Sequence, residues 1–284
     1  MVILAAILVA LILVGVGIGL ALYRLIPERW GGPLSWGRRL ALRFGSVTAF
    51  VGVAATGCIA TVLVMMPVGL LAKSLQDSID VPTLKWTLAV VDPQSVFTKL
   101  NNYVTTLGDR STTDLVCVVA GLILAFAYRR RWWIPVVAIV VTFAAQHEGQ
   151  LLLSRLLGRD LPPVVNAGAF PSGGVSRMLV DDGVIIVLVI LILGTVSRQW
   201  RAGLWIGLGT FSAIEGFTRA YLSLHWLTDI LAGLVFGWLM FFTFATATAA
   251  LETRTLLFSG ERNPPHRSLD LEQPIAAVPT RDRR

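Results

Sequence analysis

The chain has 284 residues, of which 55% are hydrophobic and only 14% are charged, and its mean hydropathy is +0.72. A soluble globular domain carries roughly 25% charged residues, so this composition excludes a soluble globule and a disordered chain. The net charge of +7 does not indicate nucleic-acid binding, because most arginines lie in short tracts between apolar blocks, where basic residues set membrane topology. The composition therefore predicts an integral membrane protein.

Seven apolar blocks are candidates for membrane-spanning helices, which need about 20 residues each. In chain order they are 2–23, 44–72, 115–128, 132–157, 175–196, 202–221 and 225–250. The first block starts without a basic region and is followed by no clear cleavage site, so we expect it to be a retained helix. The predicted fold class is all-α, an integral membrane bundle of about seven transmembrane helices.

Three arginine-rich tracts set the expected orientation. They lie within 24–43, 129–131 and 198–201. Placing them in the cytoplasm, as the positive-inside rule requires, puts the N-terminus outside and the C-terminus in the cytoplasm of a multi-pass cell-membrane protein. We expect three parts: 1–113 with two transmembrane helices and an outer-face amphipathic segment, 114–250 as the helical core, and 251–284 as a disordered cytoplasmic tail.

The outer-face segment contains a candidate surface helix. Asp92-Pro93 has the pattern of an N-cap followed by a first-turn proline. Apolar residues follow at helical spacing, at Val96, Phe97, Leu100, Tyr103, Val104 and Leu107. The stripe is typical of a helix that lies on the outer membrane surface, and packing against the other helices is an equally open interpretation.

The richest cluster of ionisable residues is TRAYLSLHWLTD, residues 218–229. His225 and Asp229 are four residues apart at the start of a helix and share one face. The carboxylate can accept the proton of one imidazole nitrogen and leave the other more nucleophilic. Arg219 offers a planar fork suited to phosphate oxygens. We predict these three as the catalytic residues.

A second segment, FPSGGVSR at residues 170–177, places small residues directly before a helix. Several backbone N–H groups and the positive end of a helix dipole then face the same space, which forms an anion cradle. We predict that Ser172, Gly173 and Gly174 bind phosphate. The alternative is that this is ordinary loop sequence.

Together these segments resemble the type 2 phosphatidic acid phosphatase superfamily, which includes membrane lipid phosphate phosphatases and soluble haloperoxidases. Its motifs are KxxxxxxRP, PSGH and SRxxxxxHxxxD. The third motif matches at Arg219, His225 and Asp229, with Thr218 in place of the serine. The resemblance covers roughly 132–250. It implies a phosphatase-like helical core in which His225 attacks phosphorus, Asp229 orients it, and neither a metal ion nor another cofactor takes part.

The other two motifs depart from the family pattern. Gly174 stands where the family has the histidine that protonates the leaving group. Aligned on its proline, the first motif has Ser154 in place of the lysine and Leu161 in place of the arginine. Arg155 and Arg159 lie nearby, and we predict that they bind phosphate instead.

Loss of the general acid matters because such catalysis typically contributes about 10²–10⁴-fold. A lipid diphosphate expels a lipid phosphate, which leaves far more easily than a lipid alkoxide, so the sequence favours diphosphates. Replacement acids are His147, Glu148, Asp181 and Asp182. The alternative is that Arg177–Asp181 and Glu215–Arg219 are neutralising i,i+4 pairs and that His147 and Glu148 are structural.

We therefore expect a lipid phosphatase that hydrolyses a polyprenyl diphosphate or a glycerolipid phosphate at the outer membrane face through a phosphohistidine. Its expected partners are the lipid substrate and the bilayer, with no nucleic acid. The alternative is a catalytically impaired relative that binds lipid phosphate or supports a partner enzyme. A zinc protease is excluded, because Leu151 stands where a HExxH motif starting at His147 needs its second histidine.

Overall fold

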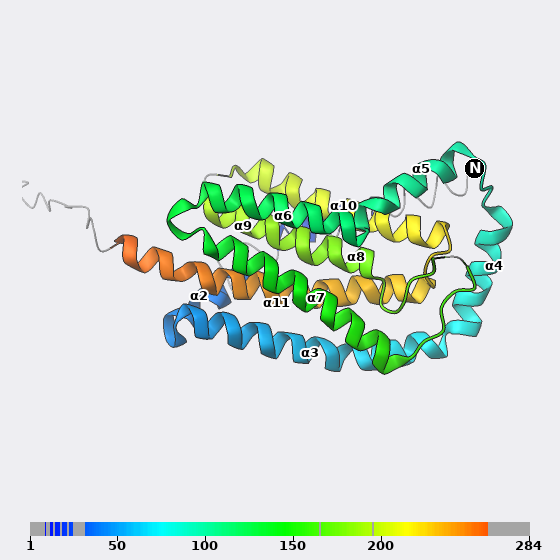
Figure 1. Ribbon diagram of the computed structural model, residues 1–284, viewed down its shortest axis with the longest axis horizontal. Helices are drawn as coiled ribbons and strands as arrows, with labels where there is room; N and C mark the ends of the chain where they lie inside the picture. The colour runs from blue at the N-terminus through cyan, green and yellow to red at the C-terminus, as the bar shows by residue number, and fades with distance from the viewer. Residues whose placement is uncertain are drawn as a thin grey trace, which may run out of the picture.

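The computed structural model describes residues 32–164, 166–194 and 196–260, together with scattered residues between 9 and 24. Every regular element in these ranges is helical, and most of the helices run along one long axis (Figure 1). The predicted span 2–23 falls largely outside the described residues, as does the tail beyond 260.

The helices of the bundle and its outer segment follow in chain order. They are α2 (Pro33–Phe44), α3 (Ser46–Ser74), the π-turn η1 (Gln76–Asp80), α4 (Val81–Val90), α5 (Val96–Thr105), the 3₁₀ turn η2 (Thr106–Gly108), α6 (Arg110–Ala127), the 3₁₀ turn η3 (Arg129–Arg131), α7 (Trp133–Leu157), α8 (Gly173–Arg177), the π-turn η4 (Met178–Asp182), α9 (Gly183–Leu193), α10 (Arg198–Tyr221) and α11 (Leu227–Gly260).

Four helices in the described ranges are long and apolar enough to cross a membrane, namely α3, α6, α7 and α11. The prediction of an all-α, membrane-embedded bundle is confirmed. The predicted span 175–196 corresponds to three consecutive elements, α8, η4 and α9, with no gap between them. The π-turn η4 separates the two α-helices. The predicted span 202–221 is α10, a more polar helix that carries Glu215 and Arg219 near its end.

Helix α11 is the axis of the bundle. It packs against α2, α3, α8 and α9, and 56% of its most apolar window is buried, against 17–28% for the other three spans. Its large side chains Phe236, Phe241 and Phe244 are almost completely buried. In Figure 1, α11 runs through the middle of the molecule along its length, and α7 crosses it in this view.

The predicted end of the last helix, at Ala250, is wrong. Helix α11 continues to Gly260, so the first residues of the predicted disordered tail are helical. The reason lies in α2, which the sequence suggested was only a connecting tract. Helix α2 packs along this end of α11. Leu251, the first residue after the predicted end, is only 2% exposed in this region.

Helix α5 turns its apolar side outward. Val96 and Tyr103 are 82% and 77% exposed, whereas Thr98 and Asn101 are buried against the bundle. Phe97, from the same predicted stripe, instead contacts the rings of Phe217 and Tyr221 on α10, with centroids 6.3 and 5.2 Å away. Surface exposure and internal packing, which the sequence left as alternatives, therefore both occur on this one helix.

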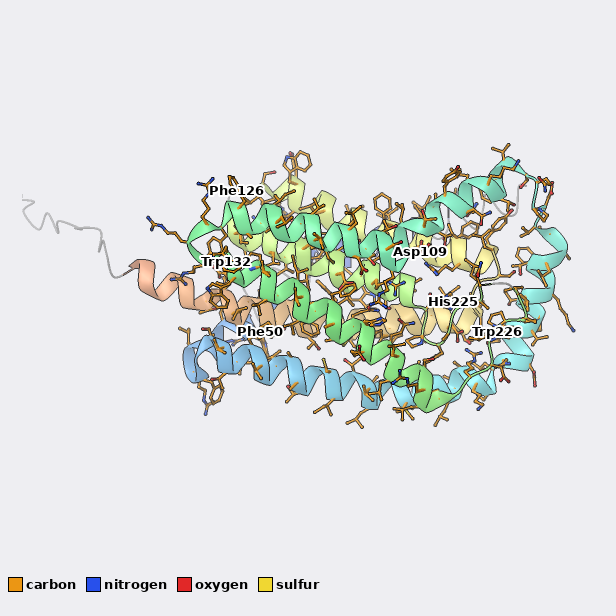
Figure 2. The ribbon with its side chains drawn as sticks, in the orientation of Figure 1. Phe50, Asp109, Phe126, Trp132, His225 and Trp226 are labelled. Carbon is orange, nitrogen blue, oxygen red and sulfur yellow. The ribbon has the colours of Figure 1, made fainter. Side chains whose placement is uncertain are left out.

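The arginine tracts gather at one end of the bundle. Figure 1 shows the α2–α3, α6–α7 and α9–α10 junctions at the same end. Phe126 and Trp132 mark this end in Figure 2, and His225 and Asp109 lie toward the other. The segment that contains His225 is thus separated from all three arginine tracts by the length of the membrane-spanning helices. Which end faces the cytoplasm stays a prediction.

Candidate active site

His225 lies in the tight connection between α10 and α11. The chain reverses over residues 222–226, where Ser223 takes a left-handed conformation with φ of +59°. The N–H of Leu224 donates a hydrogen bond of 3.0 Å to the carbonyl oxygen of Arg219. This turn carries His225 back over the end of α10, so that the side chains of His225 and Arg219 lie at the same end of the bundle.

A long loop covers the imidazole. The N–H of Gly168 donates to the carbonyl oxygen of Leu224 at 2.7 Å, and the indole N–H of Trp226 donates to the carbonyl oxygen of Asp160 at 2.7 Å. A Cβ atom at position 168 would overlap the His225 ring. Only glycine therefore permits this approach of the loop to the imidazole.

The His225 side chain is buried, with 6% of its surface exposed. Its Nδ1 atom is buried and has no hydrogen-bond partner among the described residues. Burial, and then the positive charges of Arg219 and Arg177, lower the pKa of His225 to about 3. The imidazole is therefore neutral at physiological pH, which is the form that can act as a nucleophile.

Arg219 is held by two carboxylates, one on α10 and one directly before α6. Its Nε donates to Glu215, one turn earlier on α10, and its Nη2 donates to Oδ1 of Asp109 at 2.9 Å. The predicted Glu215–Arg219 pair is thus present. Asp109 precedes the first residue of α6, so this contact joins the end of α10 to the start of a membrane-spanning helix.

Arg159 and Asp229 form a second, deeper network. The Arg159 guanidinium is ion-paired with Asp229 and with Asp80, and the exposed fractions of the three side chains are between 0% and 2%. Arg159 also donates to Oγ1 of Thr228 at 2.8 Å. Asp80 completes the network by accepting the N–H of Thr228 at 2.9 Å. Sequence reasoning assigned Asp229 to orient His225, whereas in the structure its carboxylate contacts Arg159.

The second motif is tied to the third through the backbone. The N–H of Ser172 donates to the carbonyl oxygen of Asp229 at 3.0 Å. Position 233 on α11 has no side chain, and a Cβ there would lie 2.7 Å from the carbonyl oxygen of Ser172. Gln150 of α7 supports the same segment by donating to the carbonyl oxygen of Pro171 at 3.2 Å. The predicted phosphate-binding segment 172–174 is thus fixed beside the start of α11.

The glycine at the expected histidine position has a steric explanation. A Cβ atom on Gly174 would lie within 2.5 Å of Cζ of Arg219. The guanidinium of Arg219 therefore occupies the space into which a side chain at position 174 would extend. In this chain, a histidine at position 174 and the observed position of Arg219 are mutually exclusive.

Several predicted residues do not join this cluster. Arg155 is exposed on the last turn of α7, and Glu148 is exposed earlier on the same helix. The predicted Arg177–Asp181 pair is absent from the ion pairs of the described ranges, because the π-turn Met178–Asp182 widens the helix and changes the side-chain spacing. Both carboxylate oxygens of Asp181 are buried without a hydrogen-bond partner.

Four residues that the sequence did not assign to the site belong to this end of the bundle, namely Asp80, Asp109, Gly168 and Arg177. Asp109 had a usable signal, since an aspartate directly before a helix is a common N-cap. Its carboxylate binds Arg219 instead of capping α6. Asp80 had no such sequence signal, because it lies in the outer segment, far in sequence from the motifs.

Comparison with known proteins identifies the fold. No family model matches the sequence. The structure is similar to the crystal structure of a transmembrane PAP2-type phosphatidylglycerolphosphate phosphatase from Bacillus subtilis, with a TM-score of 0.57, 23% sequence identity, and coverage of 66% of this chain and 93% of that one. The chain therefore has the fold of a transmembrane type 2 phosphatidic acid phosphatase, and the resemblance seen in the motifs is confirmed.

A sequence relative is phosphatidylglycerophosphatase B of Bacillus subtilis (strain 168). It is 27% identical over 133 residues, which are 45% of this chain and 63% of the relative. The match thus spans less than two thirds of the length of that protein.

Proposed function

We propose that this protein is a membrane lipid phosphatase that hydrolyses a lipid phosphate or diphosphate at the outer membrane face through a phosphohistidine on His225. The single observation that carries the proposal is the buried, neutral imidazole with Arg219 and Arg177 close enough for their charges to act on it. An electropositive site around a neutral nucleophile suits attack on an anionic phosphorus centre.

The reaction would proceed in two steps. A nitrogen of His225 attacks phosphorus, the bond from phosphorus to the leaving oxygen breaks, and that oxygen keeps the electron pair. Water then attacks the phosphohistidine, the phosphorus–nitrogen bond breaks, and inorganic phosphate leaves while the imidazole nitrogen recovers its lone pair. In both steps Arg219 and the N–H groups of Gly173 and Gly174 would bind the phosphoryl oxygens, since the N–H of Ser172 is already bonded to the carbonyl oxygen of Asp229.

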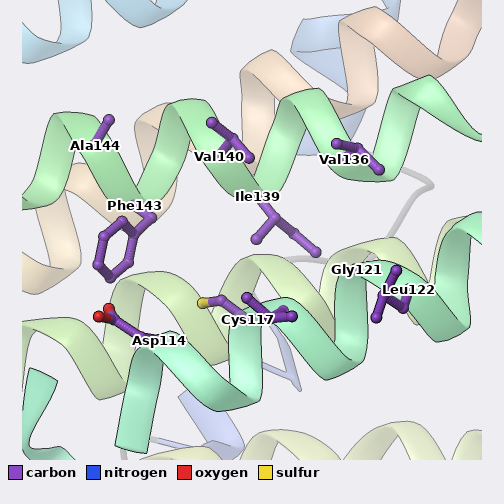
Figure 3. Close-up of a pocket in the computed structure, with 10 residues that line it drawn as sticks. Asp114, Cys117, Gly121, Leu122, Val136, Ile139, Val140, Phe143 and Ala144 are labelled. Atoms are coloured by element: carbon purple, nitrogen blue, oxygen red, sulfur yellow. The ribbon is translucent and has the colours of Figure 1, made fainter. Parts of the chain in front are cut away.

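An apolar groove supports a lipid as the substrate. A cavity of about 470 Å³ lies between α6 and α7 and is bordered by Cys117, Gly121, Ile139 and Phe143 (Figure 3). Asp114 lies at the end of the groove toward the N-terminus of α6. It is five residues after Asp109, which corresponds to about 7.5 Å along the helix. A hydrocarbon chain in the groove would thus leave its phosphate near the Arg219 end of α6.

The choice among lipid phosphates follows from Gly174. The name of the relative indicates phosphatidylglycerophosphate, a phosphate monoester whose alkoxide leaving group needs a proton. With a glycine at the general-acid position, this chain lacks the usual source of that proton. A lipid diphosphate needs none, because its leaving group is a lipid phosphate, and we therefore favour polyprenyl diphosphates over glycerolipid phosphates.

The outer-face location rests on charge. The three junctions that carry the arginine tracts lie at the end of the bundle away from His225. Basic junctions favour the cytoplasmic side, so the site would open on the opposite side of the membrane.

A second candidate function is a catalytically impaired protein that binds lipid phosphate or supports a partner enzyme. The specific observation in its favour is that Nδ1 of His225 has no partner among the described side chains, while Asp229 is paired with Arg159. An imidazole without an orienting carboxylate is a weaker nucleophile.

Phosphate release distinguishes the two functions. The purified protein in detergent and EDTA is assayed with a prenyl diphosphate, a prenyl monophosphate and phosphatidic acid, beside His225→Ala. We expect release that is fastest from the diphosphate and absent in the variant, with an acid-labile phosphoprotein trapped by rapid quenching. Release no faster than that of His225→Ala from all three substrates would favour the binding protein.

A further inference from the structure

Arg177 differs from Arg159 and Arg219, at the same end of the bundle, in forming no ion pair with a carboxylate. Arg159 and Arg219 are each ion-paired with two carboxylates. Across the described ranges, no ion pair involves Arg177. Its Nη2 donates to the carbonyl oxygen of Gly108 at 3.0 Å, and its Nε is buried without a hydrogen-bond partner. Three carboxylates, Asp181, Asp109 and Glu215, are near enough for their charges to act on Arg177, but none of them forms an ion pair with it.

The guanidinium lies directly beside the second-motif segment. A Cβ atom on Gly173 would lie 2.9 Å from Nη1 of Arg177. Arg177 is also one of the two cations whose charges lower the pKa of His225. The side chain thus lies beside the 172–174 segment and near enough to the imidazole for its charge to act there, where a phosphate bound for attack by His225 would lie.

The π-turn η4 explains why this charge is available. In a regular α-helix, Asp181 would lie one turn after Arg177 and could neutralise it. The π-turn begins immediately after Arg177 and includes Asp181. The two groups form no ion pair, although the charge of Asp181 still acts on Arg177, and neither oxygen of the carboxylate has a hydrogen-bond partner among the described residues. An unpaired guanidinium that is partly withdrawn from water lacks favourable interactions that an anionic ligand can supply.

We propose that Arg177 binds the diphosphate group of the lipid substrate and supplies the positive charge that the family obtains from its first-motif lysine and arginine. The proposal rests on the function proposed above and names a substrate-binding residue for it. Arg219 is largely neutralised by Glu215 and Asp109. Arg177 forms no ion pair and keeps hydrogen-bond donors that an anion can use.

A guanidinium at this position also determines which substrates react. Arg177 stabilises negative charge but, because arginine keeps its proton at all relevant pH values, does not act as a general acid. When the imidazole displaces a lipid phosphate, the bridging oxygen takes the electron pair and its charge is spread over a phosphate that Arg177 binds. When it displaces a lipid alkoxide, the oxygen needs a proton that Arg177 does not give. Arg177 thus favours diphosphates over monoesters.

The test separates binding from turnover. Binding of inorganic diphosphate to the full-length protein in detergent is measured by calorimetry for wild type, Arg177→Gln, Arg177→Lys and the control Arg110→Gln. Arg110 is half exposed near the same end of the bundle and is paired with Asp114 at 3.9 Å. We expect Arg177→Gln to weaken binding by about 10- to 100-fold, as for loss of a charged hydrogen bond, and Arg177→Lys to restore part of it. The control should bind like wild type.

Turnover is measured on the same proteins. We expect Arg177→Gln to lower kcat/KM for a prenyl diphosphate at least as strongly as it weakens binding, with partial rescue by Arg177→Lys. Wild-type binding of inorganic diphosphate by folded Arg177→Gln would overturn the proposal. If the wild type binds diphosphate through Arg177 but releases no phosphate, the proposed phosphatase function fails and the binding role stands.

A measurement on the wild-type protein covers the case in which Arg177→Gln does not fold. Phenylglyoxal modification of arginines is followed by peptide mass spectrometry with and without inorganic diphosphate. We expect diphosphate to protect Arg177 and to leave Arg110 unprotected. Equal modification of Arg177 in both conditions would contradict the proposal.

Discussion

The carboxylate of Asp229 is ion-paired with the guanidinium of Arg159, and each side chain is only 2% exposed. The pair links α11 to the loop after α7, and Asp80 extends it to the outer segment. Three stretches of chain that are distant in sequence are therefore held together by one buried guanidinium. Asp229, which the family motif assigns to orienting the histidine, forms a structural ion pair in this chain.

Removal of Arg159 should destabilise the fold strongly. Arg159→Met leaves Asp80 and Asp229 buried without their partner, and breaking a buried pair in this way typically costs about 3–5 kcal/mol. Arg110→Met is the control, since its pair with Asp114 is half exposed and such pairs contribute about 0–1 kcal/mol. The measurement is the free energy of unfolding in detergent. Equal stability of the two variants would contradict the structural role of Arg159.

The buried His225 should make stability depend on pH. The folded pKa of about 3 is below the unfolded value of about 6.5, so between these values the unfolded chain binds a proton that the folded protein does not. Burial of the neutral imidazole therefore does not lower the free energy of unfolding above pH 6.5. Below pH 6.5 the free energy of unfolding decreases as the pH falls toward 3. Relative to His225→Gln, which does not titrate, the wild type should lose about 2 kcal/mol between pH 8 and pH 5. A constant difference in unfolding free energy over this range would show that His225 is accessible to protons.

Restoring the family histidine at position 174 should reduce activity. The side chain in Gly174→His would displace the Arg219 guanidinium from its contacts with Glu215 and Asp109. We expect slower hydrolysis of a prenyl diphosphate and no gain with phosphatidic acid. Gly207→Ala in α10 is the control, because nothing lies within 4 Å of a Cβ at that position. A variant Gly174→His that hydrolyses phosphatidic acid faster than wild type would show that the site accommodates a general acid.

Filling the groove between α6 and α7 should affect long-chain substrates selectively. Val118 borders the groove and Val119, its neighbour on α6, does not. We expect Val118→Trp to lower kcat/KM for a long-chain prenyl diphosphate by about 10-fold or more, in line with the 1–3 kcal/mol cost of overpacking, and to spare a short-chain analogue. Val119→Trp should leave both rates unchanged. Equal effects of the two variants would exclude the groove as the chain-binding site.

The sequence predicted the parts of the fold that depend on local pattern. Hydrophobic length alone located α3 and α7 to within a few residues. It failed at α2, which is amphipathic and too short to be identified as a span, so its packing on α11 and the extension of α11 to Gly260 were missed. Both depend on contacts between distant segments, which hydropathy does not report.

For the candidate site, spacing identified the residues but not all of their partners. The Glu215–Arg219 pair was predictable because it lies on one regular helix. The Arg177–Asp181 pair was not formed, since a π-turn changes the spacing that the prediction assumed. The contact between Arg159 and Asp80 joins residues that are 79 positions apart, and no local sequence pattern predicts it.

Helix α5 has a consequence for where the protein meets its substrate. Its outward face carries Val96 and Tyr103 and its inward face carries Thr98 and Asn101, a pattern that suits a helix with lipid outside it. In a bilayer, we expect α5 to lie at the membrane surface and to hold the His225 end of the bundle at the level of the lipid headgroups. Amphiphiles diffuse to this level in two dimensions, whereas soluble phosphate esters reach it from dilute solution. If the substrate is a lipid, as proposed, this location would favour it over soluble phosphate esters before any contact between substrate and protein.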